Sequence, residues 1–159
     1  MRSLKHGMYG VANSLGAAAI AVALVTGSAA ADAPVGRYSI ADAIVLDTKT
    51  TLSWQRTVPT AIFSWPDAKA YCASLGQGAS PEQTGWRLPT VKELQTLVDR
   101  SQAAAPSIDP SAFPGTPPAF FWSSTLLAGS PSYAWSVNFA SGGTGNLDEA
   151  ETSYVRCVR

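Results

Sequence analysis

The chain has 159 residues, of which 46% are apolar and only 14% are charged, and its 11 basic and 11 acidic side chains balance to a formal net charge of zero. A chain of this length is typical of a single domain. Because a near-neutral chain lacks the basic patch that phosphate binding requires, the composition argues against nucleic acid as a partner.

Residues 1–31 have the layout of a secretory signal peptide. Two basic residues, Arg2 and Lys5, precede an uninterrupted apolar run at Leu15–Val25, and small residues follow at Ser28–Ala31. The apolar run is shorter than the roughly 20 residues that span a bilayer. We therefore expect cleavage at this point and a mature domain over residues 32–159, secreted or periplasmic and not inserted in a membrane.

Cleavage of this segment limits the catalytic groups and metal sites that the mature domain can form. The segment holds the single His, both Met and two of the bases, so the mature chain has a net charge of −2 and no His. Without His it cannot form a Ser-His-Asp or Cys-His catalytic group, or a zinc site with His ligands. We expect no cofactor, no metal and no catalytic residue.

The mature domain is predicted to begin with two strands. Tyr38–Leu46 is the first, a polar turn follows at Asp47–Thr50, and the second strand runs over Leu52–Arg56. A helix comes next, with Ser64 as its N-cap, Pro66 in its first turn and its end at Gly76. Its buried face consists of residues at helical spacing, namely Ala68, Tyr71, Cys72 and Leu75.

A second helix is predicted after the extended segment Trp86–Pro89. Thr90 and Glu93 have the spacing of a capping box, and the helix continues to about Arg100. Ala103–Ala119 then contains five prolines, which excludes a helix or an interior strand and predicts an ordered irregular loop.

The C-terminal third is predicted to form three short strands. They are Phe120–Leu127, Tyr133–Phe139 and Ser153–Val158, and the glycine-rich Ser141–Asn146 separates the second from the third. Two helices combined with a strand-rich half predict an α+β fold, with the helices packed on small antiparallel sheets beside a long irregular loop.

Cys72 and Cys157 are the only two cysteines. An exported chain passes into an oxidising compartment, where a disulfide between them is the expected state. Two buried free thiols are the alternative.

Six short motifs in a fixed order resemble those of one bacterial family. They are Asp47-x-x-Thr50-x-Leu52-x-Trp54-Gln-Arg, Trp65-x-x-Ala68-x-x-Tyr71-Cys72, Trp86-Arg-Leu-Pro-Thr90-x-x-Glu93-Leu94, Ile108-Asp-Pro110-x-x-Phe113-Pro, Phe121-Trp-Ser-Ser124 and Tyr154-Val-Arg-Cys-Val-Arg159. On these motifs, residues 43–159 resemble the Lcl C-terminal domain family, a domain of unknown function. The resemblance implies a C-type-lectin-like fold, distantly similar to formylglycine-generating enzymes, in which a helical Cys is bridged to a Cys in the last strand. Cys72 and Cys157 occupy those places.

Five Trp residues invite a sugar-binding interpretation, because an aromatic ring can stack on a pyranose. Trp54, Trp65 and Trp86 are expected to lie in the core. Trp122 and Trp135 border the proline-rich loop, which is the ligand-facing side in lectin-like folds. Core packing is the slightly favoured interpretation for both, and they are also the candidate ligand contacts. Ser124 and Asn138 are the candidate hydrogen-bonding partners beside them, with backbone hydrogen bonding as the alternative role for both.

The acidic segment Asn146–Glu151 is a candidate calcium site, because it offers several oxygen ligands within six residues. The tripeptide signatures of sugar-binding C-type lectins are absent, and a solvated acidic loop is the favoured interpretation. Arg87 and Arg156 are the candidate buried charges, held by ion pairs or backbone hydrogen bonds.

These observations lead us to expect an exported, non-catalytic binding or structural module of the bacterial envelope, glycan-binding or adhesive. Its partner would be a glycan or another envelope protein. The scattered bases argue against the sulfated glycans that adhesion in the family implies. A hydrolase using Asp109 with Glu149 or Glu151 is one alternative, although Asp109 precedes Pro110 and favours an Asx turn. A subunit that binds another envelope protein is the other.

Overall fold

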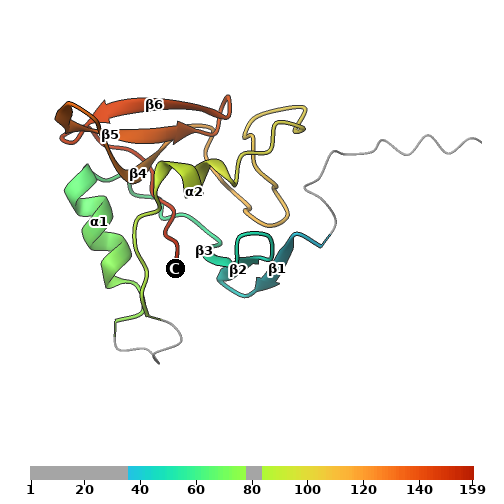
Figure 1. The fold of residues 1–159 in the computed structure, drawn as a ribbon. Coiled ribbons are helices and arrows are strands. Elements are labelled where there is room, and N and C mark those ends of the chain that lie inside the picture. Colours follow the sequence, from blue (N-terminus) through green and yellow to red (C-terminus); the bar gives the residue numbers. More distant parts are fainter. Residues whose placement is uncertain (1–35, 78–83) are drawn as a thin grey trace, which may run out of the picture.

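The structure, a computed structural model, describes residues 36–77 and 84–159. It contains two three-stranded antiparallel sheets and two helices, an α+β arrangement as predicted (Figure 1). The predicted signal peptide lies outside the described residues. Within the described ranges, no helix has both the length and the apolar character needed to cross a membrane.

The first sheet is formed by β1 (Tyr38–Ala41), β2 (Ile44–Asp47) and β3 (Leu52–Gln55), in that order. The prediction of one continuous strand from Tyr38 to Leu46 is wrong. The chain reverses at Asp42, whose φ of 48° places it in the left-handed region that Asp tolerates better than most residues. A single strand therefore becomes a hairpin.

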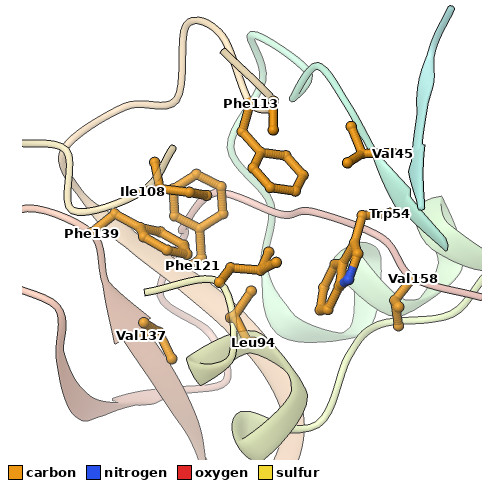
Figure 2. Packing of buried hydrophobic residues seen from close by; sticks show 11 residues of the cluster. Val45, Trp54, Leu94, Ile108, Phe113, Phe121, Val137, Phe139 and Val158 are labelled. Atoms are coloured by element: carbon orange, nitrogen blue, oxygen red, sulfur yellow. The ribbon is translucent and has the colours of Figure 1, made fainter. Parts of the chain in front are cut away.

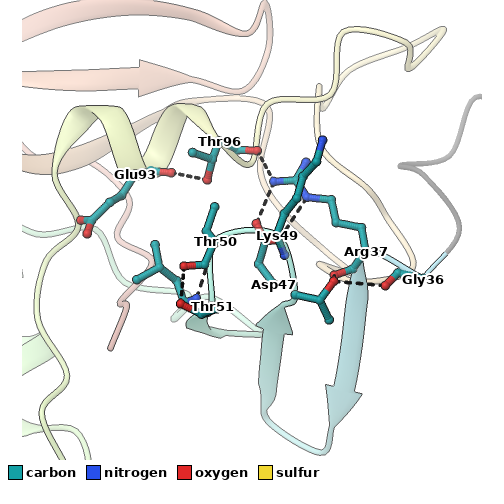
Figure 3. A network of polar contacts seen from close by, with 10 residues as sticks. Gly36, Arg37, Asp47, Lys49, Thr50, Thr51, Glu93 and Thr96 are labelled. Atoms are coloured by element: carbon teal, nitrogen blue, oxygen red, sulfur yellow. Dashed lines mark hydrogen bonds and ion pairs between the residues drawn. The ribbon is translucent and has the colours of Figure 1, made fainter.

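Arg37 pairs with Asp47 within this hairpin and also attaches it to the end of the second helix. Arg37 Nη2 lies 2.8 Å from Asp47 Oδ2 and donates to the carbonyl of Thr96 at 2.6 Å (Figure 3). Burial alone would raise the pKa of Asp47, but hydrogen bonds from Arg37 and from the Lys49 N–H outweigh it and lower that pKa. The buried carboxylate is thus kept charged by partners on neighbouring elements.

The first helix, α1 (Trp65–Ser74), has the predicted start. Ser64 Oγ accepts from the Asp67 N–H, and Pro66 lies in the first turn. Trp65, Ala68 and Cys72 form the buried face, and Gly76 follows the helix with a φ of 74°. The local capping rules therefore predict this element well.

The second helix, α2 (Val91–Gln95), also has its predicted start but ends early. Both hydrogen bonds of the Thr90–Glu93 capping box are present. The predicted extension to about Arg100 is wrong, because the chain tightens into i→i−3 hydrogen bonds and the Asp99 N–H bonds to the Ser107 carbonyl instead. A partner in the proline-rich loop therefore ends the helix.

The second sheet is formed by β4 (Phe120–Leu127), β5 (Ser130–Asn138) and β6 (Gly143–Asp148), in that order. The expectation that residues 141–146 only separate two strands is wrong, since most of them belong to β6. Gly145 explains the error: a Cβ there would lie 3.0 Å from Phe120 Cε1. Glycine, a poor strand former in sequence patterns, leaves room here for the Phe120 ring.

Residues 153–159 do not form the predicted continuous strand. They make isolated bridges to segments far apart in the sequence: Ser153 to Phe63, Tyr154 to Phe121, and Val158 to both Trp54 and Arg87. Cys157 is disulfide-bonded to Cys72, which confirms the predicted pairing and connects this segment to α1.

Two apolar clusters form the core on the two faces of the second sheet. Phe121 belongs to the larger cluster, shown with Trp54, Phe113, Phe139 and other residues in Figure 2. Trp122, the next residue on β4, belongs to the other cluster, around the disulfide. Successive strand residues point to opposite faces, so β4 separates the two clusters.

The proline-rich segment has neither helix nor strand, as predicted. Ile108 and Phe113 are fully buried in the larger cluster. The Ser107 N–H donates to the Phe139 carbonyl, and the Phe139 N–H donates to the Ala119 carbonyl, so both ends of the loop are fixed to the end of β5.

Candidate functional site

The structure does not place Trp122 at a surface. Its side chain has no exposed area, and its Nε1 donates to the Phe63 carbonyl at 2.8 Å. Buried Trp residues pair their N–H in this way. Trp122 therefore presents no face to a ligand and lies in the core, the interpretation that the sequence slightly favours.

The other predicted ligand contacts are not brought together. Trp122 is paired with Ser136, so Trp135 points to the opposite face of the sheet, where it is half-buried. Asn138 Oδ1 accepts from the Ala140 N–H and closes a turn at the far end of β5. The Ser124 N–H donates to the Pro89 carbonyl. These residues do not share one surface.

The candidate residues for calcium and for hydrolysis make local turn contacts. Asp148 Oδ1 accepts from the Ala150 N–H, and Glu151 Oε1 accepts from the Asp148 N–H. Asp109 Oδ1 accepts from the N–H groups of Ser111 and Ala112, the Asx-type turn expected before Pro110. Among the described residues, no group of three or more His, Cys, Asp or Glu side chains is placed to hold a metal ion.

The two candidate buried arginines differ. Arg156 is fully buried, whereas the Arg87 side chain is 47% exposed, so the expectation for Arg87 is wrong. Arg87 forms a bidentate pair with Glu93 at 2.7 and 2.8 Å. Hydrogen bonding from Arg87 lowers the pKa of Glu93 to about 2, against the opposing effect of partial burial.

Ser124 and Trp86 line a groove of about 450 Å³, which we call the Trp86 groove. Lys69 and Arg87 also line it. Trp86 was expected in the core, but it is half-buried, and the guanidinium of Arg159 lies 5.3 Å from its ring centroid.

A larger concave surface lies on the other side of α1. One groove of about 610 Å³ runs along α1 from Ser64 to Ser74, and a second of about 290 Å³ adjoins it beside β4 and β6. Ile62 and Thr152 line both, so we call the two together the Ile62 groove. The volume of the larger half, about 610 Å³, is in the range of ligand-binding clefts.

Half-buried aromatic rings line both halves of the Ile62 groove. Phe63 and Tyr71 stack with ring centroids 4.9 Å apart in the helix half, and Phe120 and Tyr154 lie in the sheet half. The Tyr71 hydroxyl accepts a hydrogen bond from Gln55 Nε2 at 2.9 Å, which orients its ring. Ile62, on the boundary, is 48% exposed.

The backbone under the groove is fixed. Phe63 and Ser153 exchange two N–H to carbonyl hydrogen bonds, both 2.9 Å long, and the Ser153 hydroxyl donates to the Phe120 carbonyl. The aromatic rings are therefore held by paired strands and a helix, so little conformational freedom remains to be lost when a ligand binds.

Sequence patterns could not reveal the Ile62 groove. Tyr71 has the spacing of a buried helix residue, and Ile62 follows no motif. Its lining comes from residues 62–74 and 119–154, which are joined by pairing between Phe63 and Ser153. Periodicity and capping motifs describe only local spacing, so they cannot predict a pairing between two residues so far apart in the sequence.

Comparison with known proteins identifies one family. The family model described as the Lcl C-terminal domain matches residues 43–159. No curated protein matches the chain. Because the matched region covers well over half of the sequence, the chain belongs to the Lcl C-terminal domain family.

Proposed function

We propose that this protein is an exported, non-catalytic module of the bacterial envelope that binds a glycan in the Ile62 groove. The observation that carries the proposal is the combination of four half-buried aromatic rings, an exposed Ile62 and several hydroxyl groups in one continuous concavity. Aromatic rings pack against the apolar faces of sugars, and a few polar groups orient a ligand in such clefts.

The polar atoms needed for sugar hydroxyls are present in both halves of the groove. Ser64, Asp67 and Ser74 line the helix half, and Glu151 and Thr152 line the sheet half. Asp67 Oδ2 accepts from Ser64 Oγ at 2.7 Å, which holds the carboxylate at the rim. An oriented hydrogen-bond acceptor beside an aromatic ring suits a pyranose, whose C–H face stacks on the ring while the hydroxyls at its edge donate to the acceptor.

The proposal also includes a C-type-lectin-like fold and a location outside the cytoplasm. A disulfide between α1 and the C-terminal segment supports a C-type-lectin-like arrangement and is compatible with an extracellular or periplasmic location. We expect the mature N-terminus at Asp32, which N-terminal sequencing of the protein recovered outside the cytoplasm would check.

The hydrolase alternative is not adopted, because Asp109 is occupied in its turn and lines neither half of the groove. The alternative of a subunit bound to another envelope protein predicts a stoichiometric partner on purification and no affinity for glycans.

Isothermal titration with neutral oligosaccharides of at least four sugars tests the proposal. Ile62→Arg places a long charged side chain on the boundary of both halves and is expected to weaken binding more than about tenfold. Ile40→Arg is the matched control, because Ile40 is also exposed, at 45%, but lies on β1. Equal affinity of both variants would contradict the site, and release of shorter sugars would favour the hydrolase.

A further inference from the structure

The charged side chains that line the Ile62 groove are all negative. Among the described residues that line it, Asp67 and Glu151 are acidic and none is Lys or Arg. Each half contains one of the two carboxylates, and both residues are exposed. Oδ2 of Asp67 accepts a hydrogen bond from the Ser64 hydroxyl, and Oε1 of Glu151 accepts one from the Asp148 N–H.

The elements around the groove strengthen this charge. The acidic turn that follows β6 packs on the start of α1, where the Trp65 N–H donates to the Glu149 carbonyl. Lys69 is the only base in α1, and its ammonium lies 4.1 Å from the centroid of the Trp65 ring and lines the Trp86 groove instead. A cationic ligand in the Ile62 groove therefore meets carboxylates without a competing protein cation.

We propose that the Ile62 groove selects a glycan with free amino groups, that is, an oligomer of unacetylated amino sugars. This inference rests on the proposed function and narrows its ligand class. The aromatic rings Phe63, Tyr71, Phe120 and Tyr154 contact the sugar faces, and the carboxylates Asp67 and Glu151 accept hydrogen bonds from the ammonium groups, one in each half of the groove. Aromatic faces next to carboxylates favour ammonium groups by cation–π and ionic attraction together.

A pair of ligands that differ only in N-acetylation tests the inference. The probes are a β-1,4 tetramer of glucosamine and the corresponding neutral tetramer of N-acetylglucosamine, titrated calorimetrically at pH 6. Two partly exposed ion pairs should make the glucosamine tetramer bind about tenfold more tightly at low salt. The ratio should fall as the salt concentration rises, because the charges are solvent-accessible.

The double variant Asp67→Asn, Glu151→Gln removes both charges and keeps the shape of the side chains. We expect it to bring the affinity ratio close to one while the neutral tetramer binds as before. Asp42→Asn, in the exposed turn between β1 and β2, is the matched control and should leave the ratio unchanged.

The possible results separate this inference from the proposed function. Equal binding of both tetramers, unchanged in the double variant, would overturn the charge selection and leave the glycan groove intact. Failure of both tetramers to bind would count against the inference and the proposed function alike. Binding of tetralysine with the same dependence on Asp67 and Glu151 would overturn the inference in favour of a basic peptide.

Discussion

Arg156 is a buried cation held entirely by neutral oxygen atoms. Its Nη1 donates to the carbonyls of Gln55 and Arg56, both at 2.6 Å, and its Nη2 donates to Thr116 Oγ1 at 2.7 Å. The guanidinium lies 4.6 Å from the centroid of the Phe113 ring. Burial lowers the pKa of Arg156 to about 9, so the group remains charged at neutral pH. One side chain thus joins the end of β3, the proline-rich loop and the C-terminal segment.

Replacement of Arg156 by Met should lower the free energy of unfolding by about 3 kcal/mol, because buried carbonyls lose their donors. Urea denaturation at pH 7 measures this change. Arg156→Lys retains the charge without the planar fork and should give an intermediate loss. Lys92→Met, on the exposed side of α2, is the control and should change stability by less than about 0.5 kcal/mol. Wild-type stability of Arg156→Met would contradict this role.

Trp122 and Trp135 should respond differently to truncation. Trp122→Ala should cost about 3–5 kcal/mol, because a fully buried ring and its hydrogen bond to Phe63 are lost. Trp135→Ala removes a half-buried ring and should cost clearly less. Thermal unfolding of both variants measures the difference. If Trp122→Ala instead abolished ligand binding and left the melting temperature unchanged, Trp122 would be a ligand contact and not a core residue.

At the scale of elements, the start of α2 combines a capping box with an ion pair. Glu93 accepts from the Thr90 N–H and from both terminal nitrogens of Arg87. The pKa of Glu93 is lowered from 4.5 to about 2, with hydrogen bonding from Arg87 as the largest cause. A carboxyl with a lowered pKa contributes stability above its unfolded-state pKa, and that contribution is lost as the pH falls through the folded-state value.

Glu93→Gln keeps a side chain that fits the capping box but removes the charge. We expect the variant to be about 1 kcal/mol less stable than the wild type at pH 7, a magnitude limited by the exposure of Arg87. The difference should shrink between pH 4.5 and pH 2 as the wild-type carboxyl is protonated. Urea midpoints at several pH values measure it. Glu149→Gln is the control, and a difference independent of pH for Glu93→Gln would contradict the ionic contribution.

Local sequence patterns predict the elements whose cause is local. Ser64 and Thr90 cap the two helices as expected, because a cap needs only residues three positions away. The end of α2 and the strand β6 depend on distant partners, the Ser107 carbonyl and the Phe120 ring. Those partners are set by the tertiary fold. Helix periodicity alone therefore predicts too long a helix for α2, and the glycine content of residues 143–148 leads to the prediction of a turn in place of strand β6.

At the scale of the whole molecule, the disulfide closes a loop of 85 residues. Replacement of both Cys72 and Cys157 by Ala should lower the free energy of unfolding by about 2–5 kcal/mol, chiefly by freeing the unfolded chain. Chemical denaturation of the oxidised wild type and the double variant gives the difference. Peptide mapping without reductant should recover one crosslinked pair, whereas two thiols that alkylate freely in the folded protein would contradict the bridge.

The candidate site is also a property of the whole molecule. The sequence indicates that aromatic residues and loops are available for binding, but it points to Trp122 and Trp135 because their strands border the proline-rich loop. Burial on both faces of the second sheet removes Trp122 from that surface. The concavity instead forms where the segment before α1 pairs with the segment after β6.

The bridges made by residues 153–159 make both halves of the core depend on one segment. Backbone hydrogen bonds join this segment to Ser53 and Gln55 in β3, to Arg87 before α2, and to Phe120 and Trp122 in β4. Val158 belongs to the larger apolar cluster, and Val155 and Cys157 belong to the other. Detachment of this segment would therefore disrupt both clusters at once, so we expect the two halves of the core to unfold together in a single cooperative transition.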